Sequence, residues 1–66
     1  MQLHEVSMKR SRILKALEKA GFTFKEGGSH TKAYDREGHY KAAIPRHNEI
    51  KETLAALIQK QTGVQF

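Results

Sequence analysis

The sequence contains no cysteine and only one proline. The absence of cysteine excludes disulfide bonds, thiolate zinc sites and cysteine nucleophiles. Long apolar runs are also missing, because none approaches the roughly 20 residues of a membrane-spanning helix or the apolar stretch of a signal peptide. We therefore expect a cytoplasmic protein that makes no use of a membrane.

The chain is short, with 66 residues of which 38% are hydrophobic. A domain of this size buries only about 60% of the surface that its unfolded chain exposes, which argues against a deep substrate cavity. Any active site should therefore lie on an open face. Residues 1–7 are polar and lack a period, so we expect a flexible leader there and a single domain over residues 8–66.

Positive charge is in excess, since 12 Lys and Arg against 7 Asp and Glu give a net charge of +5 with histidine neutral. This balance favours a polyanionic partner, with nucleic acid first and anionic lipid or an acidic protein second. Five of the cations lie in the first predicted helix: Lys9, Arg10, Arg12, Lys15 and Lys19. Such a run is explained either as a solvated helix face or as a surface that contacts phosphates.

Two helices are predicted from apolar periodicity. The first covers 8–20, with Ser7 as candidate N-cap and Gly21 as its end. The second covers 51–61 and ends at Gly63. Its apolar arc would hold Ile50, Leu54, Leu57, Ile58 and Gln61. Residues 46–50 would form a linker, in which Asn48 is a possible cap.

Three strands are predicted from alternating residues, over 22–26, 29–34 and 39–44. Residues 35–38 (D-R-E-G) form the turn of an antiparallel hairpin. The last strand stops at Pro45, which cannot donate a ladder hydrogen bond, and its side chains on one face would be Tyr40, Ala42 and Ile44. The expected fold is α+β with the order α-β-β-β-α, a three-stranded antiparallel sheet with both helices on one face.

His30 is the leading candidate for chemistry. It follows the small residues 27–29 at the start of the middle strand, where a phosphate backbone can approach closely, and Lys25 and Lys32 flank it in sequence. Imidazole exchanges protons near neutral pH, and neighbouring cations favour its neutral, basic form. A base beside cations is the minimum needed to cleave RNA through its 2′-hydroxyl without a metal. From composition and position alone, an exposed strand residue without chemistry remains the simpler interpretation.

The other candidate features are weaker. His47 follows Pro45 and Arg46 in a loop, where a solvated histidine is the default. The histidines are widely spaced, no pair stands at i, i+4 and cysteine is absent, so no metal site is predicted. The aromatic residues favour core packing and cross-strand pairs, because a base-stacking sheet needs exposed rings on adjacent strands.

Taken together, four segments resemble the HicA family of bacterial toxins. They are K-R-S-R-I-L-K-A-L-E-K-A-G-F at 9–22, G-G-S-H at 27–30, A-I-P-R-H-N-E at 43–49 and L-A-A-L-I-Q-K-Q-T-G at 54–63. The resemblance covers about residues 8–63 in order and spacing. No single motif is highly specific, but their combination is fairly specific.

The resemblance implies a double-stranded-RNA-binding-domain-like fold and a metal-independent endoribonuclease, an mRNA interferase that arrests translation. It implies that His30 is catalytic, that no cofactor is needed, and that a HicB antitoxin binds the toxin and masks this histidine. Operator DNA would be contacted only through that complex. The predicted substrate contacts are Gly28, Ser29, Lys25, Lys32, Arg46 and His47.

One position departs from the family pattern, because many members carry a second histidine where this chain has Thr31. If that histidine donates a proton elsewhere, His47, Lys32 or water would have to replace it here. Two other functions remain open on the residues alone. The first is an RNA-binding module without catalysis, and the second is a structural partner whose basic face only docks an acidic antitoxin.

Overall fold

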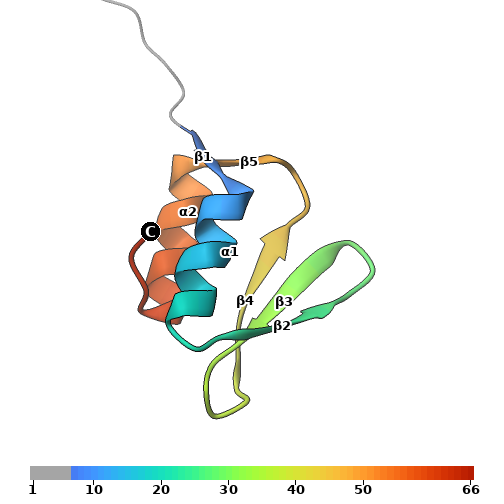
Figure 1. Cartoon of the computed structure of the whole chain (residues 1–66). Helices are drawn as coiled ribbons and strands as arrows, with labels where there is room; N and C mark the ends of the chain where they lie inside the picture. Colours follow the sequence, from blue (N-terminus) through green and yellow to red (C-terminus); the bar gives the residue numbers. More distant parts are fainter. Residues whose placement is uncertain (1–6) are drawn as a thin grey trace, which may run out of the picture.

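The computed structural model of the protein describes residues 7–66 (Figure 1). The elements in chain order are β1 (Ser7–Lys9), α1 (Arg10–Lys19), β2 (Thr23–Glu26), β3 (His30–Tyr34), β4 (Tyr40–Pro45), β5 (Glu49–Lys51) and α2 (Glu52–Thr62). Strands β2, β3 and β4 form an antiparallel sheet in that order, and β1 pairs antiparallel with β5 in a small second sheet. No helix within the described range is long and apolar enough to cross a membrane.

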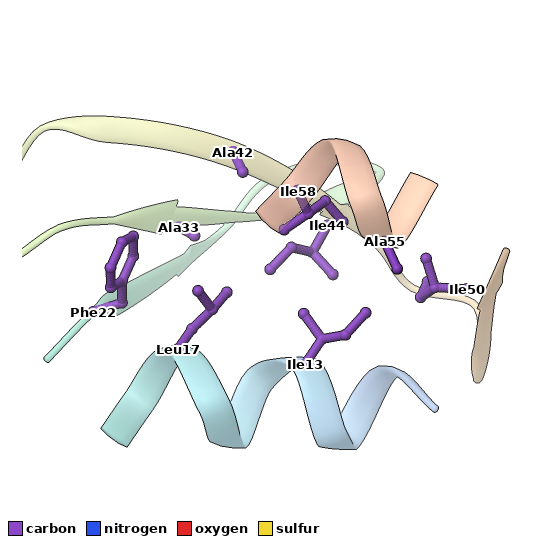
Figure 2. Close-up of a cluster of buried hydrophobic side chains, with 9 residues drawn as sticks. All are labelled: Ile13, Leu17, Phe22, Ala33, Ala42, Ile44, Ile50, Ala55 and Ile58. Atoms are coloured by element: carbon purple, nitrogen blue, oxygen red, sulfur yellow. The ribbon is translucent and has the colours of Figure 1, made fainter. Parts of the chain in front are cut away.

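The predicted α+β architecture is confirmed, with α1 and α2 packed on the same face of the β2-β3-β4 sheet (Figure 1). The buried core between them is made of nine side chains: Ile13, Leu17, Phe22, Ala33, Ala42, Ile44, Ile50, Ala55 and Ile58. In Figure 2 the two α1 residues point from below toward the sheet, with Ile58 of α2 above them. The other face of the sheet, which we call the open face, is left uncovered by the helices.

The start of the domain differs from the prediction, because α1 begins at Arg10 and the residues before it form β1. Ser7 does not cap the helix, and its hydroxyl instead donates to Glu49 Oε1 at 2.6 Å. The carbonyl of Asn48 accepts from the Arg10 amide at 2.9 Å, so a free N–H at the helix start is satisfied by the residue that precedes β5. The predicted leader otherwise falls on residues 1–6, which lie outside the described range.

The predicted linker over 46–50 was wrong in part, because its last two residues belong to β5. Pro45 also differs from the prediction, since it is the last residue of β4 and pairs with His30. The missed strand β5 has a non-local cause. Strand β5 needs β1 as a partner, and a pairing between segments about 40 residues apart leaves no local sequence pattern.

The buried face of α2 is rotated from the predicted one. Ala55 and Ile58 are buried, whereas Leu57 is 46% exposed and Gln61 is exposed. The predicted arc was counted from Ile50, which lies in β5 outside the helix. The helix ends as predicted at Gly63, whose φ of 75° is the left-handed conformation that glycine adopts most readily.

The face assigned to Tyr40 was also wrong. Ala33 pairs with Ala42, but Tyr34 pairs with Tyr40, so the register shifts by one residue at Lys41. This bulge turns Tyr40 away from the helices, while Ala42 and its neighbour two residues on remain buried. An aromatic side chain predicted to share the buried face therefore lies on the open face.

The rotation of α2 yields a paired test of the core. Replacing Ile58 by alanine should lower the free energy of unfolding by about 2–5 kcal/mol, because the side chain is fully buried and its removal leaves a cavity. Replacing Leu57 by alanine should change the same quantity by no more than about 0.5 kcal/mol, as for other exposed positions. Urea denaturation followed by circular dichroism measures both, and equal losses in the two variants would contradict the observed rotation.

Candidate functional site

Alternation along β3 divides its side chains between the two faces of the sheet. Thr31 and Ala33 are buried toward the helices, whereas His30 and Lys32 are exposed and Tyr34 is half-buried on the open face. In the antiparallel pairing Lys32 lies opposite Lys25 of β2. His30 and the two lysines therefore share the uncovered side of the sheet, which places an imidazole base on the same face as two cations.

The β2–β3 loop, residues 27–29, projects beyond the helices at one end of the sheet (Figure 1), and His30 follows it as the first residue of β3. The Gly27 amide donates to the His30 carbonyl at 2.8 Å, which closes the hairpin. Type I′ and II′ hairpin turns need a positive φ at the first central residue, and Gly28 does not have one. The loop therefore does not adopt a type I′ or II′ turn. A side chain from outside the hairpin turn stabilises its conformation.

Arg46, just after β4, supplies that support. Its Nη2 donates to the Gly27 carbonyl at 2.5 Å, and its Nη1 donates to the Gly28 carbonyl at 3.1 Å. The same guanidinium donates to Glu26 Oε1 from Nε at 3.1 Å and from Nη2 at 2.7 Å. One planar group thus satisfies two loop carbonyls and an acidic side chain, which fixes the backbone immediately before His30.

Glu26 connects this arginine to the interior. Its Oε1 also accepts from the hydroxyl of Thr31 at 2.9 Å, and Thr31, only 1% exposed, accepts in turn from Nη2 of Arg10. Arg10 Nε donates to the Pro45 carbonyl at 2.8 Å. The chain of contacts runs from the start of α1 through β3 and β2 to Arg46, on the side of the sheet opposite His30. We call it the Arg10–Arg46 network.

The hydrogen bond from Thr31 is the largest influence on Glu26 and lowers the pKa of its carboxyl, with the Arg46 hydrogen bonds and charge acting in the same direction. Both donors favour the ionised carboxylate. The network is therefore built around the Glu26 carboxylate. This group binds Arg46 directly and is linked to Arg10 through the Thr31 hydroxyl.

The imidazole of His30 is exposed and touches one polar neighbour. Its Nδ1 lies 3.0 Å from Oγ of Ser29. When Nδ1 donates to that oxygen, Nε2 carries a free lone pair and can accept a proton; in the other tautomer Nε2 carries the proton and can donate it. In either case the second ring nitrogen is left for a ligand on the open face.

The two lysines remain available to a ligand. Neither Lys25 nor Lys32 forms an ion pair with any residue from 7 to 66. The methylene chain of Lys32 runs beside Gly27, where an added Cβ would lie 3.3 Å from its Cε, and so leads toward the loop that holds His30. Lys25 places its Nζ 5.3 Å from the ring centroid of Tyr34.

Two of the remaining predicted site residues, Gly28 and Ser29, belong to this loop, and the third, His47, follows Arg46 in the chain. Gly28 is exposed, and a Cβ built on it would meet no heavy atom within 4 Å, so the backbone there is open to close approach. Ser29 contacts the imidazole directly. His47 is exposed and makes no hydrogen bond or ion pair to the described part of the chain.

Sequence reasoning missed Glu26, Arg10 and the part played by Thr31. Alternation in S-H-T-K-A-Y already places Thr31 on the face opposite His30, and that signal was available. The link from Arg10 to Thr31 spans 21 positions and carries no local signal.

The described residues contain one group of side chains with metal-ligand spacing, at the turn between β3 and β4. Ligand atoms of Asp35, Glu37 and His39 lie within 4.8 Å of one another. Asp35 Oδ1 already accepts from the amides of Glu37 and His39, both at 2.9 Å, and its Oδ2 lies 3.8 Å from Nζ of Lys41. These contacts explain the cluster as turn stabilisation, at the end of β3 far from His30.

The fold and site define a small basic α+β domain that presents His30 and two lysines on an uncovered sheet face. The family model for the HicA toxin of bacterial toxin-antitoxin systems matches residues 10–64. The chain therefore belongs to the HicA toxin family, and it is the toxin component of a toxin-antitoxin system. Comparison with curated proteins and with solved structures gave no match.

The lowered pKa of Glu26 predicts a defined dependence of stability on pH. The ionised carboxylate stabilises the folded state above its ordinary pKa of 4.5, and this stabilisation is lost as the pH falls through the lower pKa of the folded protein. A Glu26→Gln variant should therefore be less stable than wild type at neutral pH, with the difference shrinking below 4.5. Urea midpoints across this pH range measure the effect.

The Glu26→Gln variant should still lose some stability in acid because of Asp35. The pKa of Asp35 is also lowered, chiefly by the hydrogen bond from the His39 amide. As a direct check, Thr31→Val should move the NMR titration of the Glu26 carboxyl back toward 4.5, because the largest cause of the shift is removed. An unchanged titration would mean that the Thr31 hydroxyl does not hold the carboxylate in solution.

Proposed function

We propose that the protein is a metal-independent endoribonuclease that cleaves mRNA and thereby arrests translation. The observation that supports this most is the exposed imidazole of His30 on the open face, next to a loop held by Arg46 and on the same face as two lysines that have no acidic partner among residues 7–66. Membership of a toxin family is the second support, because degradation of mRNA would explain toxicity.

The proposed reaction is an internal transesterification. Nε2 of His30 takes the proton of a ribose 2′-hydroxyl, the 2′-oxygen forms a bond to the adjacent phosphorus, and the bond to the 5′-oxygen breaks. The products are a 2′,3′-cyclic phosphate and a 5′-hydroxyl. Lys32 and Lys25 neutralise the charge that develops on the phosphoryl oxygens, and the open backbone at Gly28 lets the phosphate approach.

The hydroxyl of Ser29 and the guanidinium of Arg46 act as positioning groups in this scheme. Ser29 holds one imidazole nitrogen so that the other faces the substrate. Arg46 has two loop carbonyls and Glu26 as partners, and these bonds support a positioning role, with a phosphate contact as a secondary one.

This chain has Thr31 where many family members carry a second histidine. The difference bears on which group donates a proton to the leaving 5′-oxygen. Thr31 is buried on the helix side of the sheet and bonded to Glu26 and Arg10. A side chain at this position points away from the open face, so the donor has to come from elsewhere. Lys32, His47 or water would serve, as each reaches solvent.

A HicB antitoxin is the proposed protein partner. By covering the open face it would both bury His30 and neutralise the adjacent lysines, which favours an acidic contact surface on the antitoxin. The toxin would contact operator DNA only within that complex. The competing function is RNA binding without cleavage, which the same cationic face supports.

Replacing His30 by alanine tests catalysis directly. With RNA in EDTA, cleavage by wild type should persist, and His30→Ala should lower its rate by about 10²- to 10⁴-fold, the usual contribution of a general base. His39→Ala is the matched control, because His39 is exposed in the turn between β3 and β4, at the end of the hairpin away from His30. Gel analysis of a labelled oligoribonucleotide measures the rates. Equal survival of RNA with wild type and His30→Ala would favour the binding module.

The phosphate contact of Lys32 is tested by salt dependence. For single strands, each neutralised phosphate contributes about 0.7 to the magnitude of the slope of log K against log salt. Lys32→Gln should therefore reduce that magnitude by about 0.7, whereas Lys60→Gln, an exposed lysine in the last turn of α2, should leave it unchanged. Fluorescence anisotropy at several salt concentrations supplies the slopes, and identical slopes in both variants would exclude Lys32 as a phosphate contact.

A further inference from the structure

The open face carries a pair of tyrosine rings beside the lysines. Tyr34 of β3 and Tyr40 of β4 are cross-strand partners, with ring centroids 5.8 Å apart and planes at 63°. Tyr40 is 54% exposed and, with Leu57, is one of the two exposed large hydrophobic residues in the described range. Exposed rings on adjacent strands are the condition that a base-stacking sheet requires.

The register shift in β4 is what places Tyr40 there. Without it, Tyr34 would pair with Lys41 and Tyr40 would share the buried face with Ala42. Bulges of this kind often redirect a side chain next to a functional site. The core is complete without this ring, because the buried cluster closes around Phe22, Ala33 and Ala42 at that end.

The charges around the pair suit a polyanion. Nζ of Lys25 lies over the Tyr34 ring at 5.3 Å from its centroid, and Lys25 is the strand partner of Lys32. Lys41, in contrast, is directed to Asp35, with Nζ 3.8 Å from Oδ2. The Tyr34 ring thus already contacts the Lys25 ammonium and the Tyr40 ring. Tyr40 is the more exposed of the two rings and the one more accessible to a ligand.

We propose that Tyr40, supported by Tyr34 and Lys25, is a subsite that stacks on one unpaired base of the RNA. This inference rests on the proposed function for the identity of the polyanion. Unpaired bases offer their faces to aromatic side chains, whereas bases in a duplex are already stacked. The subsite would therefore select single-stranded RNA over duplex RNA.

The position of the subsite relative to His30 follows from the strand. His30 and Tyr34 are four residues apart on the same face of β3, which corresponds to about 13 Å along an extended strand. One nucleotide step along a stacked strand is only about 3.4 Å. The base held at Tyr40 is therefore not the base on the ribose attacked at His30, and the strand runs along β3 between them, past Lys32.

Intrinsic fluorescence tests the subsite without a label on the protein. The chain has two tyrosines and no tryptophan, so its emission comes from Tyr34 and Tyr40 alone. Wild type is titrated with a single-stranded 2′-O-methyl oligoribonucleotide, which lacks the nucleophilic hydroxyl and stays intact. We expect quenching, after correction for absorption by the oligonucleotide, and much weaker quenching when the same strand is annealed to its complement.

Affinities of variants for the same fluorescein-labelled strand provide the second measurement. Tyr40→Ala should weaken binding by about 5- to 150-fold, the range expected for loss of one stacked base. Tyr40→Phe should bind within about 2-fold of wild type, because stacking uses the ring and not the hydroxyl. Leu57→Ala is the matched control, since it removes the other exposed large side chain, on α2. Thermal unfolding of each variant separates lost binding from lost folding.

The outcomes distinguish this proposal from the proposed function. If wild type cleaves RNA in a His30-dependent manner but Tyr40→Ala binds as tightly as wild type, or the tyrosine emission does not respond to RNA, the subsite is refuted and the nuclease stands. If quenching and the Tyr40 effect are observed but wild type cleaves no RNA, the subsite stands and the catalytic proposal fails. Equal quenching by duplex and single strand would also overturn the subsite.

Discussion

The register of β3 is the constraint on which the remaining structure depends. Thr31 and Ala33 enter the core while His30 and Lys32 face outward, and a slip of one residue would exchange the two sets. Two features of the buried face oppose such a slip. Ala33 is the small residue that the buried face accommodates, and the Thr31 hydroxyl is bonded on both sides, to Glu26 and to Arg10, so outward rotation would leave these groups without their shared partner.

The two faces of the sheet therefore have separate tasks. The helix side holds the hydrophobic core and, at the loop end, the Arg10–Arg46 network, which fixes the backbone before His30 from behind. The open side carries the imidazole, Lys25, Lys32 and the tyrosine pair. Because the supporting hydrogen bonds lie on the side opposite His30, the backbone before the histidine is fixed while the imidazole stays exposed.

A domain of this size has little interior to devote to a binding site, and this explains the flat, exposed character of the site. An open face of this kind is also easily covered by a protein partner, which suits a toxin whose activity must be silenced by binding. The same lysines that would attract RNA would attract an acidic antitoxin surface, so substrate and inhibitor would compete for one set of charges.

The sequence by itself determined the α+β order, the stripe of α1 on Ile13 and Leu17, the helix ends at glycine and the strand that carries His30, because periodicity and turn residues act over a few positions. Four motifs in order also sufficed for the family. Only the tertiary structure decided the β1–β5 pairing, the rotation of α2, the bulge that exposes Tyr40 and the partners of Arg46. Each of these depends on how whole elements pair and pack against one another, and neither apolar periodicity nor turn residues encode that geometry.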